Sequence, residues 1–442
     1  MSEIDEMDGV RRLLAEPPAP SPEAAAKAFG LLEREMSGGR RAGTARAGRR
    51  LRYGWPFGLG AGLAAVGAAA AVTVVVTGQG TPEPGKTAPG VDLNRQAVLA
   101  AAGKAALMPT GKYWYTDQIQ GQSYMMRPKT GEYAIVGAHS ETFEWSGAKS
   151  GMGEAFYGRD IPARPLTPKD AALWRKAGAP SAFRVWSNDH YYTYDRKTSA
   201  WEADRPDAKG GGRWLGDRDP DGGESGGLTV DDLQNLPTDP ASLAARFLKG
   251  AASDPKLERI RKTLAQMQQQ PVPADPGKRA EHAAAIKSLQ DMLKKVDEGR
   301  REDPHGSREK LMRAEDLMMD LPLPPAVRAG LMRALAAQPG VRAIGAVTDE
   351  LGRKGIALAA ADTTVHVTGE YGTPAAEQGT YTSHEEIMFD PATGQLLGSR
   401  DVLTRPGGAY RSQAPGFVIN YWLVRSSGWT DAKPEPPAKL PF

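Results

Sequence analysis

The chain has no cysteine among its 442 residues. This absence excludes disulfide bonds, thiolate metal sites and a catalytic thiol. The folded state must therefore be stabilised by packing. A chain of this length usually forms two or three folding units and can bury a sizeable core.

An excess of one charge sign is also missing. The 56 Lys and Arg residues nearly balance the 53 Asp and Glu residues, which leaves a net charge of +3. Nucleic acids are bound by strongly basic faces. The composition therefore predicts no nucleic-acid partner, and no residue pattern indicates a cofactor.

Charged residues are absent altogether from positions 53–82. The stretch from Trp55 to Val76 consists almost wholly of Ala, Gly, Val and Leu. At a rise of about 1.5 Å per residue it reaches roughly 33 Å, enough for a hydrocarbon layer about 30 Å thick. We therefore expect one transmembrane helix at residues 53–77.

Arginines flank this uncharged run on one side only. Arg49, Arg50 and Arg52 directly precede it, whereas Lys86 is the only basic residue close behind it. The positive-inside rule then places residues 1–52 in the cytoplasm and the C-terminal domain outside the cell. A cleaved signal peptide is excluded because a long polar segment comes before the run.

The pattern of residues divides the chain further. Residues 1–52 predict one short helix beginning at Ser21, and residues 78–92 predict a proline-rich linker to an extracytoplasmic domain at 93–442. Within that domain we expect an antiparallel meander interrupted by one helix. The expected helices are 94–107 and 168–176, and the strands are 112–119, 132–136, 142–145, 154–157, 183–186 and 191–194.

Apolar residues recur at three and four positions between 239 and 321. Leu257, Ile286 and Leu311 each begin such a stripe, and Pro and Gly residues separate the stripes. This period is typical of helices that bury one face. We expect three amphipathic helices that form a helical insertion near 253–321.

The C-terminal part predicts a helix at 325–337 followed by more strands. Asp390 to Gly394 has the chemistry of a hairpin turn, because Pro presets the turn and Gly accepts positive φ. The fold class is α+β: a large curved antiparallel sheet of about eleven strands, half-barrel-like, with packed helices. The C-terminal strands are expected at 341–347, 355–359, 364–368, 381–389, 396–403 and 417–424.

Two loop motifs match catalytic or nucleotide-binding patterns only in their letters. Gly80 to Thr87 matches a phosphate-binding loop, but its prolines remove N–H groups that phosphates need. Gly223, Ser225 and Gly227 match a nucleophile elbow, but an acidic loop replaces the apolar strand that should lead into it. We interpret both as plain loops.

The acidic loop before that serine carries alternating carboxylates. Asp217, Asp219 and Asp221 reproduce the first half of a calcium-binding loop. The Glu expected at the twelfth position is Leu228 instead. A weak calcium site and a plain acidic turn both remain open interpretations.

Histidines and aromatics on the predicted strands allow two interpretations. His190 and His384 have polar neighbours, but neighbours along a strand face opposite ways, so we expect cross-strand polar pairs rather than acid–base or metal chemistry. Trp114, Phe143 and Phe156 could line an apolar ligand cavity in the curved sheet or belong to its core.

Several segments of the outer domain are distinctive. They read Tyr-Trp-Tyr at 113–115, LPTDP at 236–240, LMRALAAQPGVR at 331–342, DELGRKG at 349–355 and FDPATG at 389–394. With the arginine-flanked span, they resemble a family of single-span actinobacterial envelope proteins often found beside sigma factors of the extracytoplasmic-function type. The sheet pattern is also similar to the half-barrel of lipoprotein carriers and periplasmic regulators of sigma signalling. The resemblance implies no catalytic residues.

Two functional hypotheses follow. In the first, a membrane-anchored, non-enzymatic sensor or regulator binds an envelope lipid or protein outside, while residues 1–52 contact a sigma-factor-related partner in the cytoplasm. In the second, the domain is a tethered lipid or lipoprotein carrier with an acyl chain in its sheet. A fold alone does not decide between them.

Overall fold

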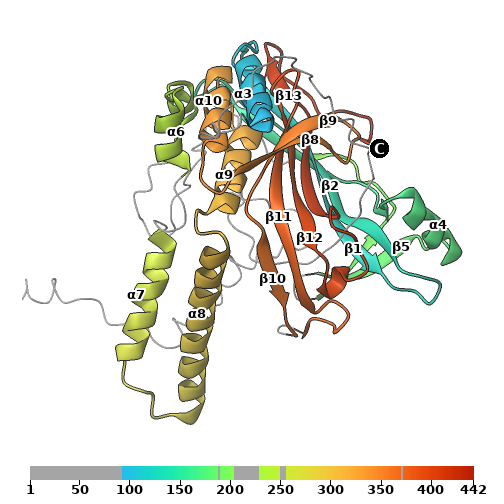
Figure 1. Cartoon of the computed structure of the whole chain (residues 1–442), viewed down its shortest axis with the longest axis vertical. Coiled ribbons are helices and arrows are strands. Elements are labelled where there is room, and N and C mark those ends of the chain that lie inside the picture. Colours follow the sequence, from blue (N-terminus) through green and yellow to red (C-terminus); the bar gives the residue numbers. More distant parts are fainter. Residues whose placement is uncertain (1–91, 188–189, 204–227, 249–254, 370–371) are drawn as a thin grey trace, which may run out of the picture. The chain divides into compact units, whose positions relative to one another are not determined.

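The computed structural model describes residues 92–187, 190–203, 228–248, 255–369 and 372–442 (Figure 1). Within these ranges, no helix combines the length and the apolar composition needed to cross a bilayer. The predicted cytoplasmic segment, the span at 53–77, most of the linker and the flanking Arg49, Arg50 and Arg52 lie outside the described residues.

The predicted α+β class with a large antiparallel sheet is confirmed. In the described residues the sheet has eleven strands in the order β7-β3-β2-β1-β13-β12-β11-β9-β8, with β10 paired to β11 and β4 paired to β2, and it does not close. The strands are β1 (Tyr113–Met126), β2 (Tyr133–Gly147), β3 (Glu154–Asp160), β4 (Arg164–Pro165), β7 (Glu202–Ala203), β8 (Arg342–Thr348), β9 (Lys354–Ala359), β10 (Thr363–Val367), β11 (Gly379–Phe389), β12 (Leu396–Arg405) and β13 (Val418–Thr430).

The prediction of two strands at 132–136 and 142–145 is wrong, because both segments belong to the single strand β2. The register shifts between Gln120 and Gln122 of β1, and Ala138 of β2 adopts a φ of 45° there. Such a bulge bends a strand without ending it. On β1, a Cβ at Gly121 would meet the Tyr421 ring at 2.5 Å, so only glycine fits under this tyrosine.

The predicted meander also divides in two. Strands β5 (Ala182–Ser187) and β6 (His190–Asp195) form a separate two-stranded sheet. Phe183 and Val185 of β5 pack in one buried cluster with Tyr133 and Ile135 of β2. Helix α4 (Pro168–Lys176) follows the prediction, because Thr167 forms a capping box with Asp170.

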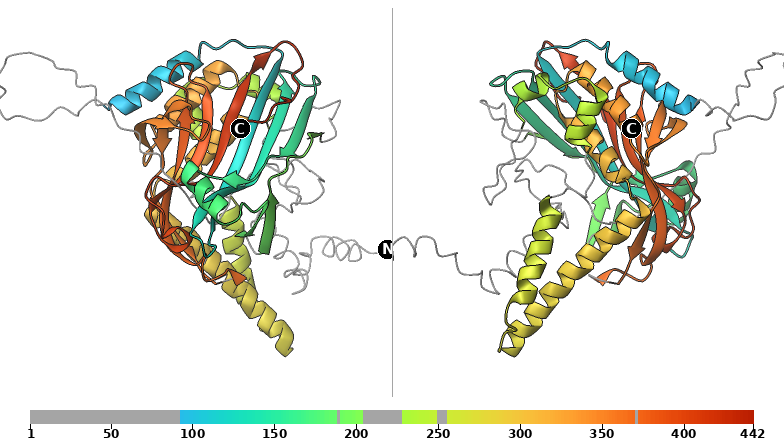
Figure 2. Two further views of the ribbon diagram at one scale, coloured as in Figure 1. Left: turned by 90° about the vertical axis from the view of Figure 1, so that its right-hand side faces the viewer. Right: turned by 60° about the vertical axis from the view of Figure 1, so that its left-hand side comes forward.

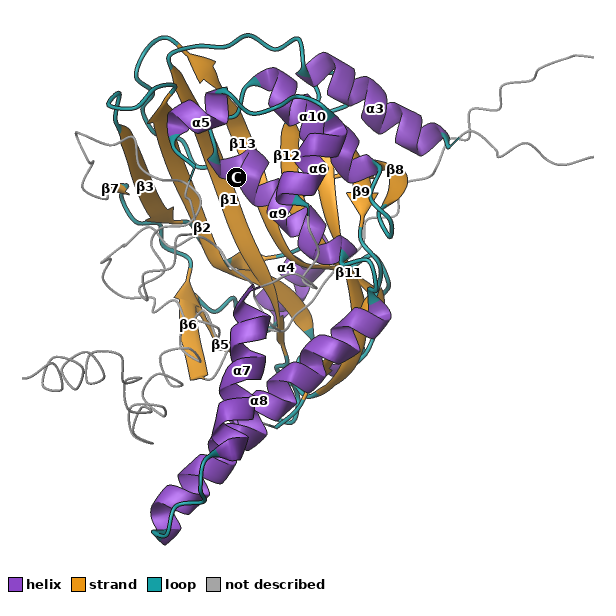
Figure 3. Cartoon of the chain, turned by 90° about the vertical axis from the view of Figure 1, so that its left-hand side faces the viewer, coloured by secondary structure: helices purple, strands orange, loops and turns teal. Residues whose placement is uncertain are grey.

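Helices cover one face of the large sheet (Figure 3). Their apolar residues share one core cluster with Leu358 of β9, Phe389 of β11 and Val424 of β13. We call this the helix-covered face. Its helices are α3 (Leu93–Ala105), α5 (Val230–Gln234), α6 (Pro240–Phe247), α9 (Ser307–Asp320) and α10 (Pro325–Ala336), and a short 3-10 helix η3 (Gly408–Tyr410) precedes β13.

The helical insertion is smaller than predicted, because only two of its three predicted helices pack together as one unit. Helices α7 (Pro255–Gln269) and α8 (Pro276–Glu302) form a hairpin with its own small cluster around Leu257, Ile260 and Leu289. Among the described residues, 255–297 belong to this compact unit. The third predicted helix, α9, instead buries Leu311 and Leu317 in the core cluster of the helix-covered face.

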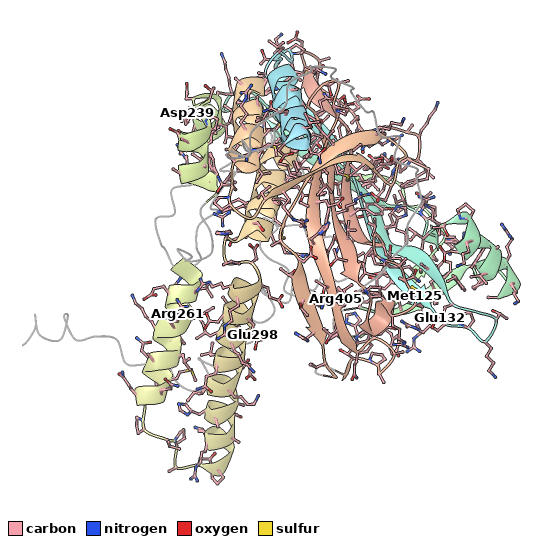
Figure 4. All side chains as sticks on the ribbon, in the orientation of Figure 1. Met125, Glu132, Asp239, Arg261, Glu298 and Arg405 are labelled. Carbon is pink, nitrogen blue, oxygen red and sulfur yellow. The ribbon has the colours of Figure 1, made fainter. Side chains whose placement is uncertain are left out.

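The distinctive segments that suggested a family build turns and caps. Asp239 of LPTDP, labelled in Figure 4, accepts the Ser242 N–H at 2.8 Å and caps α6. In DELGRKG, the Asp349 carboxylate accepts the Arg353 Nε–H at 2.7 Å across a tight turn. In FDPATG, Gly394 has a φ of 72°, as the predicted turn requires.

Candidate functional site

The sheet face opposite the helices carries a continuous group of aromatic side chains. They belong to β1, β2, β3 and the segment before β7, whose register places alternate residues of neighbouring strands on the same side. The left view in Figure 2 looks onto this face. We call the group the aromatic surface, and its members are Tyr113, Tyr115, Phe143, Trp145, Tyr157 and Trp201.

The rings of the aromatic surface contact one another across the strands. Tyr115 stacks on Phe143 with ring centroids 5.8 Å apart, and Phe143 lies 6.3 Å from Tyr157. Tyr113 meets Trp145 edge-on at 5.6 Å. Offset and edge-on pairs of this kind hold aromatic rings in fixed positions. The surface is therefore a packed apolar platform.

Residues 431–442, which we call the C-terminal tail, lie over this platform. The Lys433 Nζ sits 4.4 Å from the centroid of the Trp145 ring. The Trp201 indole Nε1–H donates to the Pro437 carbonyl at 2.9 Å. The terminal Phe442 ring packs 5.2 Å from the ring of His139. The tail thus crosses the aromatic surface and ends beside β2.

A buried charge cluster holds the middle of the tail. Glu141 of β2 is fully buried and accepts from Arg159 Nε at 2.6 Å and from Arg425 Nη1 at 2.7 Å. Arg159 Nη2 donates to the Lys439 carbonyl at 2.8 Å, and Arg425 Nη1 donates to the same oxygen at 2.9 Å. Because Glu141 orients both guanidinium groups, their remaining N–H groups can bind main-chain oxygens.

Asp117 of β1 completes this cluster. It is 1% exposed and lies 3.7 Å from Arg425. Burial raises the pKa of Asp117 to about 8, and the nearby Glu141 carboxylate adds to the rise while Arg425 opposes it. At neutral pH Asp117 therefore keeps its proton and shares a hydrogen bond with Glu141.

His139 at the end of the tail is neutral. Its Nδ1 lies 2.9 Å from the Pro162 carbonyl, and its Nε2 lies 3.2 Å from the Tyr421 hydroxyl. The carbonyl can only accept, so Nδ1 carries the proton and Nε2 accepts from the tyrosine. Burial lowers the pKa of His139 to about 4, which keeps this arrangement in place at neutral pH.

A row of polar side chains crosses the helix-covered face. The register aligns Gln122 of β1, Asn420 of β13, Asp401 of β12 and Glu385 of β11 on one line. Arg308 of α9 lies over the acidic end of this row. Its Nη2 approaches Asp401 Oδ2 at 3.1 Å and Glu385 Oε2 at 3.4 Å.

The two carboxyl groups of this row share one arginine. Burial raises the pKa of Glu385 to about 8, because Arg308 only partly offsets desolvation and the Asp401 charge adds to the rise. Glu385 is therefore protonated at neutral pH, and Arg308 forms its ion pair with Asp401. The ion pair of Arg308 with Asp401 therefore has a structural role, because it links α9 to the sheet.

His384 lies on the opposite face of β11 from Glu385. Its Nδ1 lies 2.9 Å from Asp362 Oδ1, and its Nε2 lies 3.1 Å from Glu386 Oε1. Burial favours the neutral ring, but the hydrogen bonds to both carboxylates outweigh it and raise the pKa of His384. When the ring is protonated, both nitrogens donate to these carboxylates and no lone pair is left for base catalysis.

The predicted cavity residues do not share a site. Trp114 and Phe156 face the helices, whereas Phe143 belongs to the aromatic surface on the other side. The Trp114 ring packs under Arg328 of α10 at 3.7 Å, and Phe156 is 39% exposed. A cleft beside Trp114 and Asp320 measures about 160 Å³ including space open to solvent.

The other predicted sites lie outside the described residues. This holds for Asp217, Asp219 and Asp221 of the acidic loop, for Ser225 and for the glycine-rich run that begins at Gly80. In the described part of the chain, no group of three or more His, Asp or Glu side chains could hold a metal ion. The His190 ring packs at a tilt of 35° against Tyr192 with ring centroids 4.0 Å apart.

Sequence reasoning missed both the tail and the buried acid pair beneath it. The signal for the pair was present in the strand parity, since Asp117 and Glu141 share a face with Phe143. The signal for the tail was the Pro434-Glu-Pro-Pro437 pattern at the end of the chain. Comparison with known protein families, with curated proteins and with solved structures finds no match for the chain.

Proposed function

We propose that the protein is a membrane-anchored, non-enzymatic sensor or regulator whose outer domain binds an envelope partner. The observation that carries this proposal is the aromatic surface, which only an extended tail covers in the described structure. Large apolar patches rimmed by polar groups mark interaction sites in soluble domains. The open sheet with helices on one face is also in keeping with the half-barrel of periplasmic regulators.

A non-enzymatic role is supported by how the titrating groups are used. Asp117 and Glu385 have strongly raised pKa values, which is common at catalytic sites. Both lie in buried clusters where arginine pairs the neighbouring carboxylate. Structural ion-pair networks produce the same shifts. The clusters therefore fit a role in holding helix α9 and the tail on the sheet.

The tethered carrier has less support than the regulator. An acyl chain needs an apolar pocket of several hundred Å³, typically about 300–1,000 Å³. The cleft at Trp114 reaches about 160 Å³ only when space open to solvent is counted, so its enclosed volume is smaller still. Trp114 and Phe143 also lie on opposite faces of the sheet. Mass spectrometry of the full chain extracted from membranes would revive the carrier if it found stoichiometric lipid.

The regulator is tested at its cytoplasmic end. The full chain, extracted in mild detergent from cells that express it, is expected to retain a sigma-factor-related protein. A chain lacking residues 2–45 is the matched control, since it keeps Arg49, Arg50 and Arg52, the predicted span and the outer domain. Equal recovery from both chains, or recovery from neither, would remove the link to sigma-factor signalling.

A further inference from the structure

The C-terminal tail has the pattern of a polyproline ligand. Pro434 and Pro437 are three residues apart, which puts them on the same side of a helix with three residues per turn. Pro434, Pro436 and Pro437 are all partly buried, whereas Glu435, Ala438 and Lys439 are exposed. The three prolines therefore lie nearer the sheet, while Glu435 and Lys439 face solvent and Lys433 contacts the Trp145 ring.

The surface under the tail has the aromatic rings and hydrogen-bond donors that bind such a ligand. Proline-rich segments bind in grooves lined by aromatic rings, and their main-chain carbonyls remain available as acceptors. Here Trp201 donates its indole N–H to the Pro437 carbonyl at 2.9 Å. Arg159 donates to the carbonyls of Ala438 and Lys439 at 3.4 and 2.8 Å.

These contacts read the backbone rather than the side chains of the tail. The donors Trp201 and Arg159 are fixed independently of the tail, because the Arg159 guanidinium lies 4.3 Å over the Trp201 ring and pairs with Glu141. A preorganised site lowers the ordering cost of binding. Another segment with the same proline spacing can make the same hydrogen bonds.

The tail lies on the surface rather than in the core. Leu440 is 38% exposed and Phe442 is 47% exposed. The aromatic surface beneath keeps its own ring contacts, such as Tyr115 on Phe143. Lifting the tail would thus uncover the platform without removing a core element.

We propose that the aromatic surface, with Trp201 and Arg159, is a docking site for a proline-rich segment of a partner protein, and that the C-terminal tail occupies it as a built-in competitor. This inference deepens the proposed function and rests on it, because it gives the chemistry of the envelope partner. The partner segment carries a Pro-x-x-Pro spacing followed by a basic residue, as the tail itself does.

The test uses a fluorescein-labelled peptide of residues 431–442 as the probe. Its binding is measured by anisotropy to the full chain and to the same chain ending at Asp431. We expect at least tenfold tighter binding to the shortened chain, because its site is vacant. A peptide with alanine in place of Pro434, Pro436 and Pro437 is the control and should bind at least tenfold more weakly.

Two matched substitutions locate the site on the shortened chain. Trp201→Phe keeps a ring but removes the N–H donor, and it should weaken peptide binding at least tenfold. Trp114→Phe makes the same change on the helix-covered face and should leave binding unchanged. Equal binding to both variants, or no peptide binding by a folded shortened chain, would overturn the proposal.

A second variant covers the case in which the shortened chain does not fold. Pro434→Ala with Pro437→Ala in the full chain loosens the tail and should expose the site to the peptide. No gain in binding by this folded variant would count against the proposal. Dimers of the intact chain that disappear when the tail is removed would identify a second copy as the occupant and exclude a separate partner.

The outcomes also separate this inference from the proposed function. Peptide binding without any sigma-related protein at residues 1–52 would support the docking chemistry and remove the regulatory role. Recovery of that protein with no peptide binding would do the reverse.

Discussion

At the scale of single residues, neighbours on a strand serve different environments. Glu385 and Glu386 are adjacent on β11, yet Glu385 faces Arg308 of α9 and Glu386 faces His384 and Arg400. The first keeps its proton at neutral pH because it is desolvated beside Asp401. Burial and partner geometry, rather than residue type, decide the charge of each carboxyl group.

Glu385→Gln tests the protonated state of this buried carboxyl. The folded pKa near 8 lies above the ordinary value, so between about pH 4.5 and pH 8 the unfolded chain loses the proton first and stability falls as pH rises. Gln cannot titrate. Urea unfolding should show that Glu385→Gln loses less free energy of unfolding between pH 5 and pH 8 than the parent does. The expected difference is roughly 1–3 kcal/mol.

Asp401→Asn provides the contrast within the same ion pair. It leaves Arg308 with only the desolvated Glu385, so the free energy of unfolding should drop by about 2–4 kcal/mol at pH 7.

Some pH dependence should persist in Glu385→Gln, because Asp117 titrates in the same window. A parent-like slope in Glu385→Gln would contradict a protonated Glu385.

The two histidines with shifted pKa values, His384 and His139, should respond to pH in opposite ways. His384 has a raised pKa, so its stabilisation is present below about pH 6.5 and is lost as pH rises through the folded value. His139 has a pKa near 4, so it destabilises the fold as pH falls from about 6.5 toward 4. Nitrogen-detected NMR at pH 6 should show His384 doubly protonated and His139 neutral.

Single substitutions assign these signals, because the chain has only six histidines. His384→Gln should lower the free energy of unfolding more at pH 6 than at pH 9. A neutral His384 at pH 6 would mean that Asp362 and Glu386 do not both accept from the ring.

At the scale of elements, the sequence predicted correctly those elements whose bounds are set by neighbouring residues in the chain. Helix α4 spans Pro168–Lys176 as expected, since Thr167 and Pro168 mark its start in the sequence itself. Strand β2 was predicted in two pieces, because its bulge at Ala138 is set by the pairing with β1. Amphipathic period also could not tell that α9 packs on the sheet while α7 and α8 pack on each other.

Gly121→Ala tests the close approach of β1 and β13. A Cβ there would lie 2.5 Å from the Tyr421 ring, so the ring or the strand must shift. We expect a loss of about 1–3 kcal/mol in the free energy of unfolding, measured by urea denaturation. Gly103→Ala in α3 is the control, because its Cβ meets nothing within 4 Å and should stabilise the helix by roughly 0.5–1 kcal/mol.

At the scale of the whole molecule, the candidate site depends on which residues share a face. A shift of one residue in pairing moves every side chain of a strand to the other face. In the pairing of β1 with β2, Trp114 lies opposite Ser146 and Asp117 lies opposite Phe143. Trp114 and Phe143 therefore lie on opposite faces of the sheet, although both belong to the aromatic-rich part of the sequence. The sequence could predict aromatic strands, but the register and the tail needed the three-dimensional structure.

The predicted partition of the chain by a membrane can be tested with single cysteines, because the chain has none of its own. Leu107→Cys places a thiol on a side chain that is 84% exposed, and a membrane-impermeant maleimide should label it in intact cells. Ser21→Cys in the predicted cytoplasmic segment should be labelled only after the cells are permeabilised. Leu335→Cys is the burial control, since Leu335 is 0% exposed and should react only after denaturation. Labelling of Ser21→Cys in intact cells would reverse the orientation inferred from Arg49, Arg50 and Arg52, and it would place the aromatic surface on the side of the membrane where no envelope partner can reach it.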